Sequence, residues 1–284
     1  MAYEPSAQFE VKTFDVEIPR QGSPLLARVY QPQGPGPFPA LLDVHGGAWS
    51  GGDRTSDEQT DTTLATSGMV VVSPEIRIGP KDPYPAQMQD INLATRWLKV
   101  HVGELQGDPS TVGGIGSSSG GHSVILSAMR PRDSRYGALT LAGAEGVDAS
   151  LRYVIGCWPI VDPFARYEYA KERNNANLIK NHDGYWLTTD AMKEGNPALI
   201  LERGESAELP PLLVLQGTAD DNIPYQIVEA FPPKWRAAGG DAAIELFEGQ
   251  PHGFGSRPGP AQERFIALIK TFVQGCLAGR MATV

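Results

Sequence analysis

A serine stands at the centre of residues 116–120, "GSSSG", which fit the pattern G-x-S-x-G. The pattern lies between a strand-like apolar run, "TVGGIG", and a helix-like run, "GHSVILSAM". A sharp strand-to-helix turn holds its central residue at unusual backbone angles, and glycines two positions away on either side let the two elements pack closely. We therefore expect Ser118 to present its hydroxyl as a candidate nucleophile, with the neighbouring serines in supporting roles.

Three other interpretations of this stretch are weaker. A flexible Gly/Ser linker would not be flanked without a gap by strand and helix patterns. A Walker A phosphate loop needs Gly-Lys-Ser/Thr, and the stretch has no lysine. A dinucleotide-binding turn requires Gly or Ala where Ser119 stands, and it belongs in a first βα unit rather than in mid-chain. Since G-x-S-x-G also occurs by chance, the nucleophile needs support from other residues.

A serine hydroxyl becomes a good nucleophile only when a base removes its proton and a carboxylate orients that base. The segment "LLVLQGTADDNIP" places Asp220 and Asp221 in a loop directly after a buried strand, and "LFEGQPHGFG" places His252 in the loop after the last strand. Each alone could be an ordinary loop residue. The order Ser, Asp, His is the one expected of a nucleophile on such a strand-to-helix turn, so the three loops together predict a catalytic triad.

Acyl transfer also requires donors for the negative charge that develops on the substrate carbonyl oxygen. The glycine-rich turn in "DVHGGAWSGGDR" follows a strand and exposes backbone N–H groups. We expect the N–H groups of Gly47, Ala48 and Ser119 to form this oxyanion hole. His45 in the same turn is better explained as a structural residue. The five histidines show no zinc-ligand spacing, so neither a metal nor an organic cofactor is expected.

The composition excludes several classes of partner. The chain has 284 residues, a net charge of −9 and charges of both signs interspersed, which argues against a nucleic acid or an anionic membrane surface. No apolar run reaches the roughly 18 residues of a membrane helix, and the N-terminus lacks the pattern of a secretory signal. Cys157 and Cys276 lie in apolar contexts without metal-ligand spacing. We expect a cytoplasmic protein with buried free thiols.

Strand-like and helix-like segments alternate along the chain, which is typical of a mostly parallel sheet flanked by helices. The first two strands are expected to form an antiparallel edge. The expected strands cover residues 9–18, 25–30, 40–44, 69–76, 111–116, 152–158, 210–217 and 242–249. The expected helices cover residues 88–98, 121–129, 227–238 and 263–277, the third being broken or kinked by Pro232 and Pro233.

Residues 159–208 do not fit this alternation, because about 50 residues is too long for a plain connection. The segment is rich in aromatic and charged side chains and predicts an inserted helical lid. Its aromatic residues could line a substrate pocket or pack the lid onto the body. The side chains of Arg166, Lys171, Arg173 and Asn174 could make that pocket partly polar, although such residues more often form a solvated face. We expect substrate contacts from Trp49, Trp158, Tyr185, Trp186 and Phe254.

The motifs "HGGAW", "EIRIGPKDPYPAQMQDINLATRWL", "GIGSSSGG", "GTADDNIP" and "PHGF" occur in this order from about residue 40 to the C-terminus. In these motifs the chain resembles α/β-hydrolase fold carboxylesterases of the hormone-sensitive-lipase-like and acetyl-esterase/kynurenine-formamidase-like type. The resemblance implies that Asp220, the first aspartate of "ADD", orients the base, and that His252 is the base. Ala48 stands where the lipase group has a third glycine, and the "HGGxW" form is closer to the acetyl-esterase and formamidase branch.

Together these features predict a single α/β-hydrolase domain over residues 1–284 that cleaves a small carboxylic ester through an acyl-enzyme on Ser118. An arylformamidase that cleaves an aryl amide is the alternative within the same chemistry. A non-catalytic ligand-binding protein on the same scaffold is a third hypothesis, disfavoured because all three triad residues are present. The sequence does not determine the oligomeric state and allows a homodimer.

Overall fold

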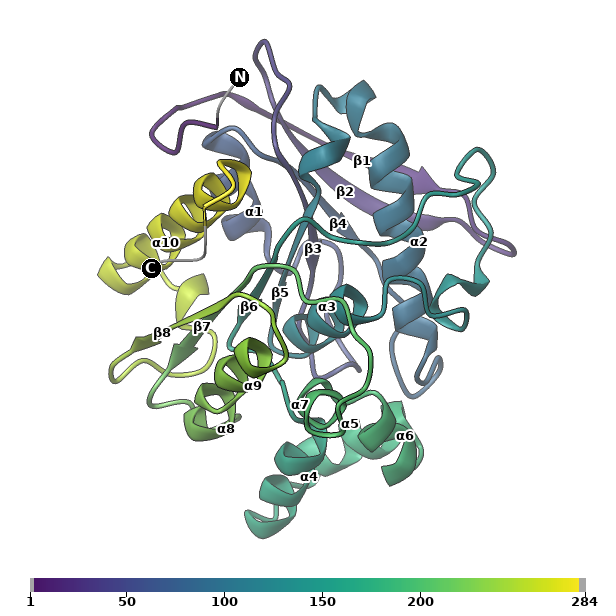
Figure 1. Ribbon diagram of the computed structural model, residues 1–284, viewed down its shortest axis with the longest axis vertical. Coiled ribbons are helices and arrows are strands. Elements are labelled where there is room, and N and C mark those ends of the chain that lie inside the picture. The colour runs from purple at the N-terminus through teal and green to yellow at the C-terminus, as the bar shows by residue number, and fades with distance from the viewer. Residues whose placement is uncertain (1–2, 281–284) are drawn as a thin grey trace.

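The computed structural model describes residues 3–280 and shows a sheet of eight strands in the order β1-β2-β4-β3-β5-β6-β7-β8 (Figure 1). The strands are β1 (Val11–Ile18), β2 (Leu25–Pro32), β3 (Ala40–Val44), β4 (Val70–Pro74), β5 (Gly113–Ser117), β6 (Val154–Cys157), β7 (Leu212–Gly217) and β8 (Ala242–Phe247). β2 pairs antiparallel with both β1 and β4, and the other pairings are parallel. The predicted mostly parallel sheet with an antiparallel N-terminal edge is confirmed.

Helices cover both faces of this sheet (Figure 1). On one face lie α1 (Glu58–Thr66) and α10 (Pro260–Leu277), which bury side chains such as Leu64 and Phe272 against the strands. On the other face lie α2 (Ala86–His101), α3 (Ser119–Met129) and α9 (Phe231–Ala237). Two apolar cores therefore sandwich the sheet, as the alternation of elements predicts.

The burial of the strands explains their sequences. β3, β4 and β7 are buried at every position, and accordingly they are short and mostly apolar, as expected of parallel strands covered on both faces. Their buried polar residues are Asp43, Ser73 and Gln216. β1 instead alternates exposed and partly buried residues, because it lies at the sheet edge with one face open to solvent. The change in pattern therefore marks where the antiparallel edge begins.

One helical region follows the expectation that it is broken, and another was not expected. The helix expected over 227–238 is divided into α8 (Tyr225–Glu229) and α9, with Pro232 and Pro233 in the first turn of α9, where a missing N–H breaks no helical hydrogen bond. Helix α1 was not expected at all. Its buried residues Thr60, Asp61, Leu64 and Ala65 are half polar, so apolar periodicity gives no signal there.

Four short helices follow β6: α4 (Pro163–Glu172), α5 (Ala176–Trp186), α6 (Thr189–Glu194) and α7 (Pro197–Glu202). Each begins at a residue whose side chain accepts a hydrogen bond from a backbone N–H of the first turn, namely Asp162, Asn175, Thr188 and Asn196. The helices lie together beyond the carboxyl ends of the central strands (Figure 1).

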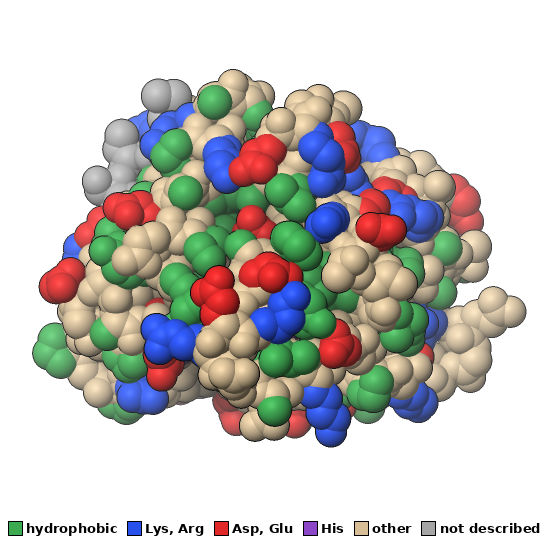
Figure 2. Space-filling view, turned by 90° about the horizontal axis from the view of Figure 1, so that it is seen from below, with side chains coloured by type: hydrophobic (Ala, Val, Ile, Leu, Met, Phe, Trp, Pro, Cys, Tyr) green, Lys and Arg blue, Asp and Glu red, His purple; other side chains and the backbone are tan. Residues whose placement is uncertain are grey.

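The surface on this side carries Lys and Arg side chains interspersed with Asp and Glu (Figure 2). Such mixing matches the charge pattern of the sequence and gives no continuous basic patch on this face. Within residues 3–280, no helix is both long enough and apolar enough to cross a membrane.

Candidate active site

Ser118 lies in the sharp turn that joins β5 to α3. Its backbone angles are φ 52° and ψ −116°, which are rare for a residue with a side chain. The turn has no room for a Cβ on either side: one added to Gly116 would lie 2.6 Å from the carbonyl oxygen of Gly120, and one added to Gly120 would lie 2.5 Å from that of His45. Glycines two residues either side of Ser118 are therefore a steric requirement of this turn.

The loops after β7 and β8 bring an acid and a base to this turn. Ser118 Oγ lies 3.0 Å from His252 Nε2, and His252 Nδ1 lies 2.7 Å from Asp220 Oδ2. An ionised carboxylate only accepts hydrogen bonds, so Nδ1 carries the proton and Nε2 is free to accept one from the serine hydroxyl. The structure thus brings together the three predicted triad residues.

Asp220 is held by several donors besides His252. Its Oδ1 accepts hydrogen bonds from the backbone N–H groups of Asn222 (2.9 Å) and Ile223 (2.8 Å), and Gln216 Nε2 donates to Oδ2 at 3.0 Å. Burial acts to raise the pKa of Asp220, but the hydrogen bond and charge of His252, with these other donors, outweigh it and lower the pKa. The carboxylate is therefore ionised at neutral pH.

The neighbouring Asp221, which the residues alone did not distinguish from Asp220, points elsewhere. It is exposed, and its backbone carbonyl accepts a 3.4 Å hydrogen bond from the hydroxyl of Tyr169. The structure therefore places only the first aspartate of the pair against His252. Gln216 and Asn222, which hold Asp220, were missed by the sequence analysis; their position within four residues of the acid is the available signal.

The loop after β3 lies directly against the nucleophile turn. Gly47, Ala48 and Trp49 all have positive φ, at 117°, 50° and 59°. The Trp49 N–H donates to Ser119 Oγ at 3.1 Å, so the serine after the nucleophile ties the loop in place. Ser119 is also the first residue of α3, where a backbone N–H has no intrahelical acceptor. Gly47 and Ala48 line a cavity together with Ser118.

That cavity has a volume of about 500 Å³ and includes Ser118 and His252 in its wall. Of the five residues expected to contact substrate, Trp158 lines it, with its ring centroid 6.2 Å from that of His252. Phe254 is buried instead between Trp158, Phe247 and Phe265. Its closeness to His252 in sequence did not bring it to the cavity wall.

Trp49, Tyr185 and Trp186 are also placed away from this wall, in an aromatic cluster beneath the loop after β3. The rings of Trp49 and Tyr185 stack with centroids 5.4 Å apart and planes 4° apart, and Trp186 meets both edge-on. These three therefore pack the loop against α5. For Tyr185 and Trp186 this is the packing role that the sequence analysis gave as the alternative to lining the pocket.

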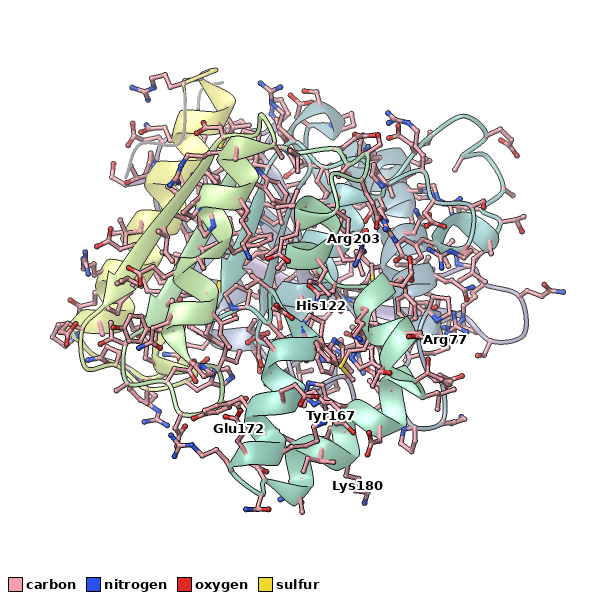
Figure 3. The ribbon with its side chains drawn as sticks, turned by 60° about the horizontal axis from the view of Figure 1, so that its bottom comes forward. Arg77, His122, Tyr167, Glu172, Lys180 and Arg203 are labelled. Carbon is pink, nitrogen blue, oxygen red and sulfur yellow. The ribbon has the colours of Figure 1, made fainter. Side chains whose placement is uncertain are left out.

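His122 connects this cluster to the helices after β6. Its Nδ1 accepts a hydrogen bond from Trp49 Nε1 (3.2 Å), and its Nε2 donates to the carbonyl oxygen of Gly195 (2.8 Å). Figure 3 shows His122 inside the molecule, whereas Lys180 of α5 projects outward at the lower edge. His122 thus joins the loop after β3 to the segment that follows α6.

The buried histidines should make stability depend on pH. Burial lowers the pKa of His122 to about 4 and that of His182 to about 3, whereas an unfolded histidine titrates near 6.5. Below about pH 6.5 these histidines bind protons in the unfolded chain but stay neutral in the native state. The free energy of unfolding therefore falls as the pH falls toward about 4. We expect His122→Gln to remove on the order of 2 kcal/mol of this fall, measured by urea unfolding at about pH 7 and about pH 4.5.

The matched control for this measurement is His101→Gln, since His101 is a half-exposed histidine at the end of α2. It keeps both buried histidines, so the fall in the free energy of unfolding that they cause between about pH 7 and about pH 4.5 should persist. An unchanged pH dependence in His122→Gln would show that His122 is not held neutral by its surroundings.

Within residues 3–280, no group of three or more His, Cys, Asp or Glu side chains is arranged to hold a metal ion. The cavity wall contains two charged side chains: Asp57, which the sequence analysis did not identify, and Arg166, which it considered both for the pocket and for a solvated face. Asp57 accepts a 3.0 Å hydrogen bond from Ser117 Oγ, and burial raises its pKa. The sequence indicates the burial of Arg166 by its helical spacing from Pro163 and Ala170, which form the buried face of α4 with it.

Comparison with known proteins identifies a matching family and several relatives. A family model described as BD-FAE matches residues 28–234. Three Mycobacterium tuberculosis proteins are similar in sequence: a "Probable carboxylic ester hydrolase", LipM (27% identity over 71% of this chain), Esterase LipC (28% over 79%) and Carboxylic ester hydrolase LipN (27% over 88%). The chain spans only 46%, 56% and 66% of these three relatives, respectively.

Solved structures share the fold. An esterase from Pyrobaculum calidifontis superposes with a TM-score of 0.77 at 22% identity, over 94% of this chain and 86% of its own. The carboxylesterase EstE1, from a metagenomic library, gives 0.78 at 23%, over 95% and 91%. Thermogutta terrifontis Est2 with bound propionate gives 0.72 at 21%, over 98% and 97%. The α/β-hydrolase fold and the resemblance to esterases of this fold, both predicted from the motifs, are confirmed.

Proposed function

The chain belongs to the BD-FAE family, and from this premise we propose that it hydrolyses carboxylic esters with Ser118 as nucleophile, His252 as base and Asp220 as the orienting acid. One observation carries the proposal: the continuous hydrogen-bonded chain from Ser118 Oγ through His252 to Asp220, at 3.0 and 2.7 Å. This arrangement at the carboxyl ends of β5, β7 and β8 is what nucleophilic acyl transfer requires.

In the first half of the reaction, Ser118 Oγ attacks the ester carbonyl carbon while His252 Nε2 takes the hydroxyl proton. The N–H groups of Gly47, Ala48 and Ser119 bind the resulting oxyanion. The Trp49 N–H is engaged by Ser119 Oγ and so is not counted among these donors. When the carbon–oxygen bond to the alcohol breaks, His252 gives its proton to the leaving oxygen and the acyl group stays on Ser118.

In the second half, water attacks the acyl-enzyme and His252 takes one of its protons. A second oxyanion forms in the same place and collapses, the acid leaves, and the proton returns to Ser118 Oγ. Asp220 remains ionised throughout and stabilises the protonated imidazole, which fits its lowered pKa. No step calls for a metal or an organic cofactor.

The proposed substrates are small esters. A cavity of about 500 Å³ is in the lower half of the usual range for small-molecule sites. Two solved structures of Thermogutta terrifontis Est2, which shares this fold, have bound propionate and bound butyrate, and these are short acids. We further propose that α4 to α7 act as the predicted lid over this cavity. Cytoplasmic location and a homodimer stay predictions from the sequence.

Labelling with a fluorophosphonate probe tests the nucleophile. We expect one adduct, mapped by peptide mass to Ser118, and its complete loss in Ser118→Ala, because among residues 3–280 this is the hydroxyl that is hydrogen-bonded to His252. Ser117→Ala is the matched control; its hydroxyl bonds Asp57, and the adduct on Ser118 should persist. An adduct on Ser117 or Ser119, or none, would refute the assignment.

The choice between ester and amide rests on a second measurement. Phenyl formate is an ester, and formanilide is the corresponding amide. We expect the ratio of their kcat/KM values, ester to amide, to exceed the ratio of their uncatalysed hydrolysis rates. The opposite result would favour the arylformamidase alternative. Binding of either compound without turnover would favour the non-catalytic one.

A further inference from the structure

Arg166 places a buried cation in the wall of the cavity that contains Ser118. It is 1% exposed, and it is the only Lys or Arg among residues 3–280 that is buried. Lys171 and Arg173, near the end of the same helix, are exposed, as the sequence analysis expected of the charged residues in this segment. Arg166 therefore departs from the solvated face that its neighbours form.

The polar contacts of this guanidinium are all with neutral groups. Nε donates to Asn222 Oδ1 at 3.1 Å, and Nη2 donates to the same oxygen. His182 Nδ1 donates to the carbonyl oxygen of Leu178, so its Nε2 can accept from Arg166 Nη1, at 3.5 Å. Among the described residues, no carboxylate forms an ion pair with Arg166. Since a guanidinium has five N–H donors, at least two are left for another acceptor.

A buried charge without a counter-ion is costly, and ordinary packing does not require one. Burial lowers the pKa of Arg166 to about 10, which still leaves the guanidinium charged at neutral pH. Asp220 is near enough to stabilise that charge, but its two oxygens already accept from His252, Gln216 and two backbone N–H groups. The positive charge is therefore available to a ligand.

The remaining polar wall of the cavity is compatible with an anion beside Arg166. The amides of Asn181 and Asn222 are neutral. Asp57 is the acidic side chain of the wall; it precedes α1 and bonds Ser117, beside the nucleophile turn, and it makes no ion pair with Arg166 among the described residues. An arginine matches the two oxygens of a carboxylate because its N–H groups form a planar fork.

We propose that Arg166 recognises a carboxylate on the substrate, so that the preferred substrates are short esters that carry a second, ionised carboxyl group, such as monoesters of dicarboxylic acids. This inference rests on the proposed esterase function. Arg166 is then a specificity-determining residue that binds the substrate away from the scissile bond.

Two matched pairs of esters, each differing by a methyl group replaced with a carboxylate, test this proposal. Ethyl butyrate and monoethyl succinate differ on the acyl side, and propyl acetate and 3-acetoxypropanoate differ on the alcohol side. Acid release at constant pH gives kcat/KM for each. In at least one pair we expect the wild type to prefer the charged ester, and Arg166→Met to lower the charged-to-neutral ratio on the order of 10- to 100-fold.

The ratio separates recognition from a structural role. If Arg166 only holds Asn222 in place, Arg166→Met lowers kcat/KM for both members of a pair alike and the ratio is unchanged, which would overturn the proposal. Arg166→Lys should keep part of the preference, since it keeps the charge but not the fork. Arg173→Met, the same change at an exposed site at the end of α4, should keep all of it. A wild type that prefers the neutral ester in both pairs also overturns the proposal.

If no ester is cleaved, the esterase function is refuted. Calorimetric measurement of binding still tests the role of Arg166 in that case. Succinate should bind the wild type more tightly than butyrate, and Arg166→Lys should reduce that difference. Equal dissociation constants for the two acids would overturn the role of Arg166. If Arg166→Met fails to fold, the binding of succinate and butyrate to the wild type and to Arg166→Lys still tests the role of Arg166.

Discussion

His252→Ala should lower kcat for a short neutral ester by roughly 10⁴- to 10⁶-fold. Without the imidazole, no other side chain among the described residues forms a hydrogen bond with Ser118 Oγ and could take its proton; His252 Nε2 lies 3.0 Å from that hydroxyl. Fluorophosphonate labelling of Ser118 should slow with it, since the probe reacts with the activated hydroxyl. Steady-state kinetics and the labelling rate of the same preparations give both values.

His101→Ala is the matched control, because it removes a histidine from the end of α2, outside the cavity wall. It should leave both rates near the wild-type values. Asp220→Asn should fall between the two variants, with a loss on the order of 10⁴-fold, because the amide no longer favours the productive tautomer of His252. A loss of less than about tenfold in His252→Ala would mean that another group serves as the base.

Gly120→Ala should destabilise the protein by more than about 3 kcal/mol and abolish hydrolysis with it. The added methyl group would lie 2.5 Å from the carbonyl oxygen of His45 and closer still to that of Val44. Both obstacles are backbone atoms at the end of β3, so no side-chain rotation can relieve the clash. The turn would have to move away from the loop that carries Gly47 and Ala48. Urea unfolding measures the first effect and ester hydrolysis the second.

Gly275→Ala is the contrasting control. Gly275 lies inside α10, and a Cβ there would meet nothing within 4 Å. The same substitution should therefore stabilise the protein by about 0.5–1 kcal/mol, since alanine loses less backbone entropy in a helix. If Gly120→Ala unfolds at the same urea concentration as the wild type, the close approach of α3 to β3 is not a constraint on the fold.

Ser119 shows how one side chain links the nucleophile turn to the loop after β3. Its hydroxyl accepts from the Trp49 N–H, and the Trp49 ring is in turn packed against Tyr185 and bonded to His122. This arrangement is a set of contacts among segments more than 60 residues apart in the sequence. Aromatic residues that the sequence suggested for the pocket are used here to hold the loop that lines it.

Much of the fold was predictable because local sequence patterns indicate where its strands and helices lie. The strands β3, β4 and β7 are mostly apolar, and parallel strands place the loops at their carboxyl ends along one edge of the sheet. That rule, with the order of Ser118, Asp220 and His252, was enough to expect the three side chains together. Helix α1 was not predictable in this way, because half of its buried residues are polar.

The sequence by itself determined the alternation of strands and helices and the motif residues at strand ends, because both depend on nearest neighbours along the chain. Only the tertiary structure decided that Trp49, Tyr185 and Trp186 lie in the core and that Arg166 turns inward to the cavity. These outcomes depend on which distant segments meet. Burial and hydrogen-bond partners depend on these tertiary contacts, and no local pattern of residue types specifies them.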